Sequence, residues 1–225
     1  MGEGGRRGSP SDGSSNRIPM SSAVRAVTAA SSSAFALDTY LVKEHVGLFK
    51  AANNFDLYDP ATGQIVLLCR EEKLGMFTRL LRFTDYKRYT PFDISVRTPD
   101  GDLVAQVTRG IAILRSTVEV RDGRGRLLGT FRQKLFSIGG AFDILDLTEK
   151  VVCTLKGKWT GWDFRFLAGT TELAKVTKKW AGIGKELFTS ADNYVISIAP
   201  SVPADGPTRP LIVAAVLCID MVFKE

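Results

Sequence analysis

The chain has 225 residues, 44% hydrophobic and 24% charged, which is enough for one large β domain or two small domains. The three cysteines are widely spaced and form no CxxC pair, which excludes zinc and redox motifs and favours a reducing compartment. The formal net charge of +6 favours an anionic partner, either a phospholipid surface or a nucleic acid, although a generic basic surface explains it equally.

The chain begins with a tail rich in glycine, serine and arginine. We predict that residues 1–37 are disordered and that one domain covers residues 38–225. No apolar core of a signal peptide precedes residue 40, so we expect a cytoplasmic protein.

The first predicted strand covers residues 40–46 and contains His45, the only histidine of the chain. Ser-His-Asp or Cys-His catalysis would have to use this residue, and its alternating surroundings indicate a strand histidine at the surface instead. The sequence also lacks phosphate-binding, dinucleotide-binding and nucleophile-elbow glycine motifs. We therefore predict that the protein is not an enzyme and needs no cofactor.

The middle of the chain repeats one pattern five times: an apolar alternating run, a polar turn that often holds glycine, and a second apolar run. Such alternation around Asp-Gly or Pro-x-x-Gly turns predicts β-hairpins. The five predicted hairpins cover residues 55–70, 92–107, 117–131, 142–155 and 163–176.

Together with strands at 40–46 and 194–198, these hairpins predict twelve antiparallel strands. An open sheet of twelve strands leaves two edges exposed, and closure into a barrel removes both. A barrel of this size is too wide for strand side chains alone to fill, so it needs a further element inside.

A segment between the first two hairpins, residues 71–88, has an amphipathic helical pattern. Leu74, Phe77 and Leu81 share one face. The basic residues around that face are Lys73, Arg79, Arg82, Lys87 and Arg88. A short basic amphipathic helix can lie on an anionic bilayer, and the alternative is a helix packed over one end of the barrel.

Lysines and tryptophans gather in a second set further along the chain. The lysines are Lys156, Lys158, Lys175, Lys178, Lys179 and Lys185, and the tryptophans are Trp159, Trp162 and Trp180. Tryptophan beside lysine suits a membrane interface or the stacking of single-stranded nucleic acid. Because no RRM or KH signature is present, we expect no nucleic-acid partner. Alternatively, the tryptophans belong to the core at one barrel end.

The chain ends with an apolar helix that begins at Pro210, a favourable first helical residue. Residues 211–219 are all apolar, and Asp220 interrupts the run before Phe223. A helix that is apolar all round must be enclosed by protein or lipid. Residues 211–223 reach only about 20 Å at about 1.5 Å per residue, which is short for a bilayer span. We therefore predict an all-β closed barrel that encloses this helix, with a single-pass anchor as the alternative.

Three stretches resemble the phospholipid scramblase family: residues 175–194, the Asn-Phe-Asp-Leu-Tyr-Asp start of the first hairpin at 54–59, and the ending 218–225. The resemblance covers residues 38–225 and follows the order of the hairpins. The family is related to tubby C-terminal domains and to LURP-one-like proteins. It implies a tubby-like barrel of twelve strands around a C-terminal helix, as well as lipid binding with transbilayer phospholipid movement.

The stretch that carries the family's calcium-binding acids has lost most of its acidic residues in this chain. Only Asp192 remains as a carboxylate, and calcium prefers six to eight oxygens. We therefore expect weak calcium binding at best. The cysteine-rich run for palmitoylation is also missing.

We predict a membrane-associated protein that contacts anionic lipid. The predicted contact residues are Lys73, Phe77, Arg79, Arg82, Lys87, Arg88, Lys178, Lys179 and Trp180. The alternative is a soluble tubby-like module that binds a protein or an apolar ligand.

Overall fold

The computed structural model describes residues 34–45, 54–71, 90–110, 117–133, 141–158, 162–178 and 193–223. The described chain forms twelve strands and a helix. The strands are β1 Thr39–Glu44, β2 Phe55–Tyr58, β3 Ile65–Glu71, β4 Phe92–Arg97, β5 Leu103–Arg109, β6 Thr117–Asp122, β7 Leu127–Gln133, β8 Ala141–Leu145, β9 Val151–Lys158, β10 Asp163–Ala168, β11 Thr171–Thr177 and β12 Asn193–Ile198, and the helix is α3 Thr208–Phe223.

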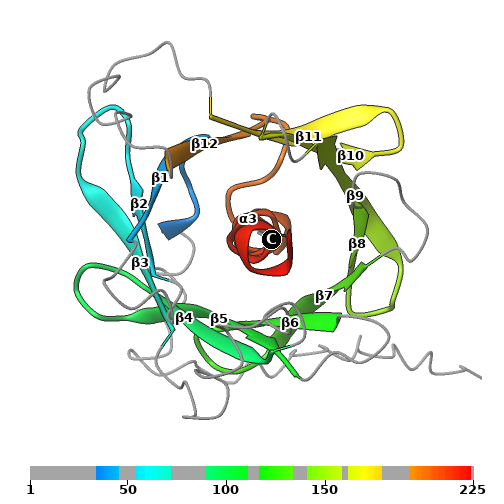
Figure 1. Ribbon diagram of the computed structural model, residues 1–225, viewed down its shortest axis with the longest axis horizontal. Coiled ribbons are helices and arrows are strands. Elements are labelled where there is room, and N and C mark those ends of the chain that lie inside the picture. The colour runs from blue at the N-terminus through cyan, green and yellow to red at the C-terminus, as the bar shows by residue number, and fades with distance from the viewer. Residues whose placement is uncertain are drawn as a thin grey trace, which may run out of the picture.

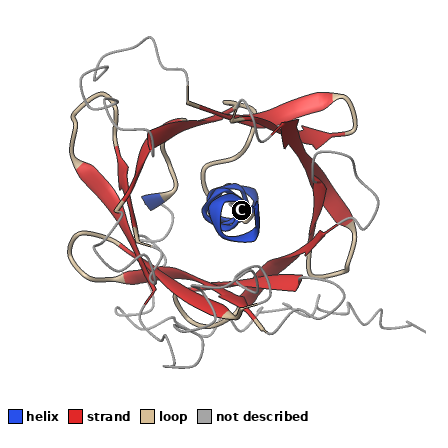
Figure 2. Cartoon of the chain, viewed as in Figure 1, coloured by secondary structure: helices blue, strands red, loops and turns tan. Residues whose placement is uncertain are grey.

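The strands form one closed barrel (Figures 1 and 2). Each strand pairs antiparallel with its neighbours in the chain, and β1 closes the barrel by pairing with both β2 and β12. All five predicted hairpins and both predicted flanking strands are present, which confirms the predicted twelve-strand barrel.

Helix α3 runs through the inside of the barrel (Figure 2). Residues 211–219 are all buried, and Ile212, Val216 and Leu217 have no exposed surface. The prediction that the barrel encloses the apolar helix is therefore confirmed. The helix begins at Thr208, two residues before the predicted start, because a proline within the first helical turn lacks only an N–H that has no partner inside the helix.

The segment before β1 also contributes to the core. Phe35 is 2% exposed and packs within the core cluster, whereas the predicted boundary at residue 38 assigned it to the tail. Arg209 of α3 fixes this segment. Its guanidinium donates to the carbonyls of Ala36, Leu37 and Val202, and Nη2 lies 2.6 Å from Asp38 Oδ1. Ala34 and Phe35, which precede the predicted boundary, thus contribute to the core, and the bounds of the domain stay a prediction.

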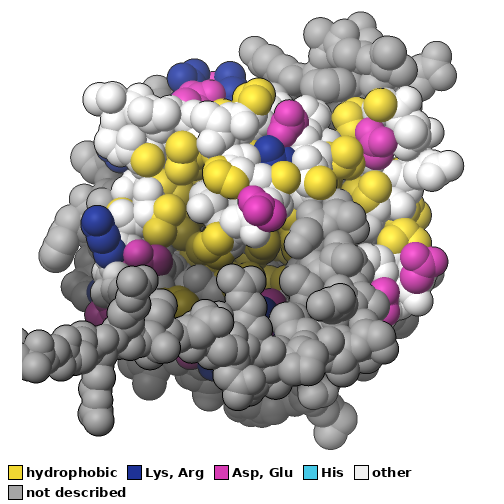
Figure 3. Space-filling view, turned by 180° about the vertical axis from the view of Figure 1, so that it is seen from behind, with side chains coloured by type: hydrophobic (Ala, Val, Ile, Leu, Met, Phe, Trp, Pro, Cys, Tyr) yellow, Lys and Arg dark blue, Asp and Glu magenta, His cyan; other side chains and the backbone are white. Residues whose placement is uncertain are grey.

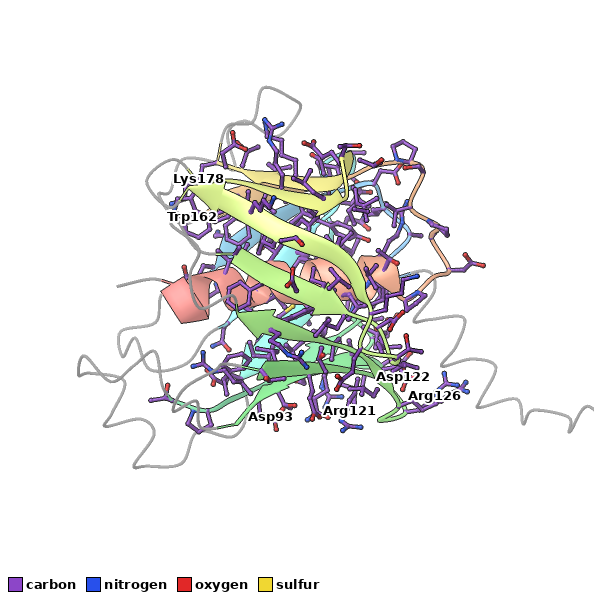
Figure 4. The ribbon with its side chains drawn as sticks, turned by 90° about the vertical axis from the view of Figure 1, so that its right-hand side faces the viewer. Asp93, Arg121, Asp122, Arg126, Trp162 and Lys178 are labelled. Atoms are coloured by element: carbon purple, nitrogen blue, oxygen red, sulfur yellow. The ribbon has the colours of Figure 1, made fainter. Side chains whose placement is uncertain are left out.

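Three of the hairpin turns have the same geometry. In each, the first residue, Thr98, Asp122 or Asp146, accepts a bond from the backbone three residues later and donates to the carbonyl four residues later. The fourth position has a positive φ and is glycine in the first two turns but Glu149 in the third. All the hairpin turns lie at the barrel end where α3 begins, called here the turn end (Figure 4).

Candidate functional site

The candidate site is a cluster of aromatic and cationic side chains at the barrel end opposite the turn end. Figure 4 labels Trp162 and Lys178 there, whereas Asp122 and Arg126 lie at the turn end. Trp162 directly precedes β10 and Lys178 directly follows β11. Asp163 pairs with Thr177, so the register of this hairpin brings Trp162 and Lys178 together.

Lys178 lies on the face of the Trp162 ring, with Nζ 4.4 Å from the ring centroid. The same indole stacks on the ring of Tyr194 of β12. The two ring centroids are 5.2 Å apart, and the ring planes form an angle of 25°. Phe164 meets the indole edge-on at 6.1 Å. Tyr194 and Phe164 belong to the core, so the tryptophan is anchored in the barrel while its cation lies at the barrel end. We call Trp162, Lys178 and Tyr194 the Lys–Trp cluster.

The backbone of Trp162 is strained, since its φ is 45°, in the left-handed region. A bulky residue rarely adopts this conformation, which costs on the order of 1–3 kcal/mol. Strain of this kind persists where the surroundings fix it, and it concentrates at functional sites. Here the stack on Tyr194 and the contact with Phe164 hold the indole in place.

Of the predicted contact residues, the structure describes Lys178 alone. The others lie outside the described residues and remain predictions: Lys73, Phe77, Arg79, Arg82, Lys87, Arg88, Lys179 and Trp180. The sequence set of lysines and tryptophans included Trp162 and Lys178 but missed Tyr194. Tyr194 follows the last pair of the β11–β12 register, Thr177 with Val195, and this pairing of the two strands could not be read from the lysines and tryptophans alone.

The only histidine belongs to a polar network on the outer face of the barrel. Asp56 is buried, and its carboxylate lies 2.5 Å from His45 Nε2 and 2.6 Å from Arg70 Nη2. Arg70 also donates to the carbonyl of Phe55 at 2.9 Å. This network satisfies a buried carboxylate, which is the usual requirement for a buried charge.

The three thiols are core residues. Burial raises the pKa of Cys153 and of Cys218 to about 12 and also raises that of Cys69. Each thiol therefore stays protonated near neutral pH, whereas a nucleophile or metal ligand requires the thiolate.

Within the described ranges, no three His, Cys, Asp or Glu side chains form a group that could hold a metal ion. Asp192 lies outside these ranges, so weak calcium binding stays a prediction. In the same parts of the chain, no helix combines the length and the apolar character needed to cross a bilayer.

A protein-family model described as Scramblase matches residues 37–225. The chain belongs to the Scramblase family. This membership confirms the family resemblance of the sequence, and the match covers the whole barrel and its enclosed helix.

No curated protein matches this Scramblase-family chain. Among solved structures, the Scramblase-family chain is similar to an X-ray structure of a protein from Arabidopsis thaliana, AT5G01750, at 16% identity. The TM-score is 0.48, and the alignment covers 81% of this chain and 90% of the plant protein.

Proposed function

We propose that this Scramblase-family protein binds anionic phospholipid surfaces through one end of its barrel and does not catalyse covalent chemistry. The observation that carries the proposal is the Lys–Trp cluster, in which a cation lies on an anchored indole at one barrel end. Tryptophan is favoured at the headgroup level of a bilayer, and lysine can extend its charge toward phosphate while its stem stays apolar.

The distribution of charge along the barrel supports this orientation. The hairpin turns and the connection before α3 carry more carboxylates than basic residues. The carboxylates are Asp59, Asp100, Asp102, Asp122, Asp146, Glu149 and Asp205, against Arg124, Arg126 and Lys150. Figure 3 shows the turn end, with Asp and Glu side chains spread over it. An anionic surface repels such an end, so the Lys–Trp end is the one expected to face the membrane.

Helix α3 fills the lumen of the barrel, and this restricts the path that a phospholipid could take between the two leaflets. Residues 211–219 of α3 are buried inside the barrel, so the lumen has no room for a lipid chain while the helix stays in place. We therefore propose that any phospholipid movement between leaflets runs along the outside of the barrel. An apolar ligand inside the barrel would likewise have to displace α3.

A second candidate function is a protein-interaction module. It is favoured by a shallow pocket on the outer face of β12, β1 and β2, lined by Leu41, Lys43, Tyr58 and Asn193. This pocket lies outside the filled lumen and is open to a partner's side chain.

Flotation with vesicles separates the two candidates. At low salt, the wild-type protein should float with vesicles that contain phosphatidylserine. It should stay in the bottom fraction with vesicles of phosphatidylcholine alone, and also with phosphatidylserine vesicles at high salt. A variant with Trp159→Phe and Trp180→Phe keeps Trp162 as its one tryptophan. Brominated lipid should quench the emission of this variant if Trp162 lies at the interface. Equal recovery on neutral and anionic vesicles would reject the electrostatic account and favour the interaction module.

A further inference from the structure

The outer wall of the barrel carries a row of cations next to the Lys–Trp cluster. In the register of the sheet, Arg165 of β10 lies directly opposite Lys156 of β9 on one side and Lys175 of β11 on the other. The residues adjacent to them, such as Leu155, Phe164 and Val176, point into the core. Side chains alternate along a strand, so the three cations point outward from the wall. We call Lys156, Arg165 and Lys175 the cation row.

The cation row departs from the charge pattern of the rest of the sheet. In the described registers, the other directly opposed charged residues have opposite signs: Lys43 with Asp56, Arg132 with Asp143, and Lys158 with Asp163. Both like-charged pairs share Arg165. Like charges directly opposite each other destabilise a sheet, so the row costs stability unless other groups offset its charge.

Two carboxylates offset part of this repulsion. Glu172 lies 3.2 Å from the guanidinium of Arg165, and Asp163 lies 3.8 Å from both Arg165 Nε and Lys175 Nζ. Among the described residues, no carboxylate forms an ion pair with Lys156, which is exposed. Since the side chains of Arg165 and Lys175 are 52% and 37% exposed, an anion can reach the row from solvent. The three cations exceed the two carboxylates, which leaves the row positive.

We propose that the cation row binds the phosphate group of an anionic phospholipid headgroup. The planar guanidinium of Arg165 can hold phosphate with two parallel hydrogen bonds, and a lysine on each side adds a point charge. Arg165 is three residues beyond Trp162, roughly 10 Å along an extended strand. The barrel therefore rests on the membrane with the β9–β11 wall as well as the Lys–Trp end. This inference rests on the proposed function and specifies its contact surface.

Vesicle binding of charge variants tests the row. Lys156, Arg165 and Lys175 are changed together to Gln, and the matched control changes Arg97, Arg132 and Lys150, which lie elsewhere on the barrel, to Gln. Both variants lose the same formal charge. Three basic residues at an anionic surface account for about 100-fold in affinity, and two nearby carboxylates reduce this, so we expect the row variant to lose at least tenfold. The control should lose less than threefold, roughly the effect of distant, screened charges.

A second pair of variants acts in the opposite direction. Asp163→Asn and Glu172→Gln remove the carboxylates that compete with phosphate for the row. Each should strengthen binding to phosphatidylserine vesicles by up to about fivefold. If the carboxylates served folding alone, their loss would lower the melting temperature and leave vesicle binding unchanged, and that result would overturn the proposal.

The same data separate failure of the row from failure of the proposed function. Equal losses in the row variant and in its control would overturn the row while leaving anionic membrane binding intact. No binding of the wild type to anionic vesicles would reject both. Millimolar glycerol 3-phosphate, a soluble phosphate, should compete only weakly with vesicles. If it displaces the protein completely, the row is a site for a free phosphate compound and the lipid assignment is wrong.

Discussion

Arg209 Nη2 lies 2.6 Å from Asp38 Oδ1, and this contact joins the first turn of α3 to the segment that leads into β1. The same guanidinium donates to the backbone carbonyls of Ala36, Leu37 and Val202. Arg209 is 3% exposed, so its buried positive charge needs these four acceptors in place of water. One side chain therefore joins the enclosed helix, the start of the barrel and the connection before the helix.

Replacing Arg209 with Met should destabilise the protein by about 3–5 kcal/mol, because it leaves the buried carbonyl of Val202 and the part-buried carbonyls of Ala36 and Leu37 without a donor. Asp38→Asn should cost less, since the side chain of Asp38 is 53% exposed. Urea denaturation measures both variants. A loss below about 1 kcal/mol for Arg209→Met would show that water replaces the guanidinium without penalty.

Phe35→Ala should lower the free energy of unfolding by about 3–5 kcal/mol, as expected for a phenylalanine in a packed core. Phe35 is 2% exposed. A domain that begins at residue 38 predicts no effect of this change. A chain shortened to residues 38–225 should show a similar loss, and equal stability of the full and shortened chains would support the boundary at residue 38.

Glu149→Gly should stabilise the protein by about 1 kcal/mol, because Glu149 has a φ of 60° that glycine adopts without strain. The exposed contact between Glu149 and Arg132, at 3.8 Å, contributes little to stability. Gly125→Ala is the reciprocal control in the equivalent turn, where φ is 77°, and it should be destabilising. Thermal unfolding measures both changes, and a lower melting temperature for Glu149→Gly would contradict the prediction.

Asp122 should make stability depend on pH. Burial raises the pKa of its carboxyl, but the backbone and side chain of Arg126 and the backbone N–H of Arg124 donate to it, so the net pKa lies below the usual 3.8. A lowered pKa stabilises the fold above the pKa of the unfolded state, and this contribution is lost as pH falls through the folded pKa.

Asp122→Asn should therefore be less stable than wild type near neutral pH, by about 1–3 kcal/mol, a range typical of hydrogen bonds to a charged group. The difference should shrink as pH falls below about 4, the range in which an aspartate titrates. Denaturation at several pH values measures it. A difference that is constant with pH would show that the hydrogen bonds do not depend on the charge.

Lys178→Gln with Lys179→Gln should weaken binding to anionic vesicles by about 2 kcal/mol if the Lys–Trp end is the contact. The triple change of Arg79, Arg82 and Lys87 to Gln should then bind normally. If the helix predicted at residues 71–88 is the contact instead, the triple change should weaken vesicle binding by about 3 kcal/mol and the change of the two lysines should leave binding unaltered. Flotation at low salt measures both sets.

The sequence was sufficient to predict the hairpins, because each one depends on alternation and turn residues within about twenty positions. Phe35 could not be placed, since its segment packs against parts of the chain far along the sequence: the hydrogen bond from Arg209 to the carbonyl of Ala36 joins residues 173 positions apart. The pairing of Trp162 with Lys178 follows from the hairpin register and could have been predicted. Arg165 was missed because the lysines of the set were identified by composition, without the strand register.

The position of α3 after all twelve strands has a consequence for how the protein is made. During synthesis the barrel strands emerge first, and the helix that fills their lumen emerges after them. The pairing of β1 with β12 must also wait until most of the domain has been translated. Until then, a sheet with a wide apolar face and two open edges is exposed to other chains, a condition that favours aggregation. Because the helix that completes the core is synthesised last, the barrel of the nascent chain closes late. Until it closes, the chain must avoid aggregation on its own or with the help of a chaperone.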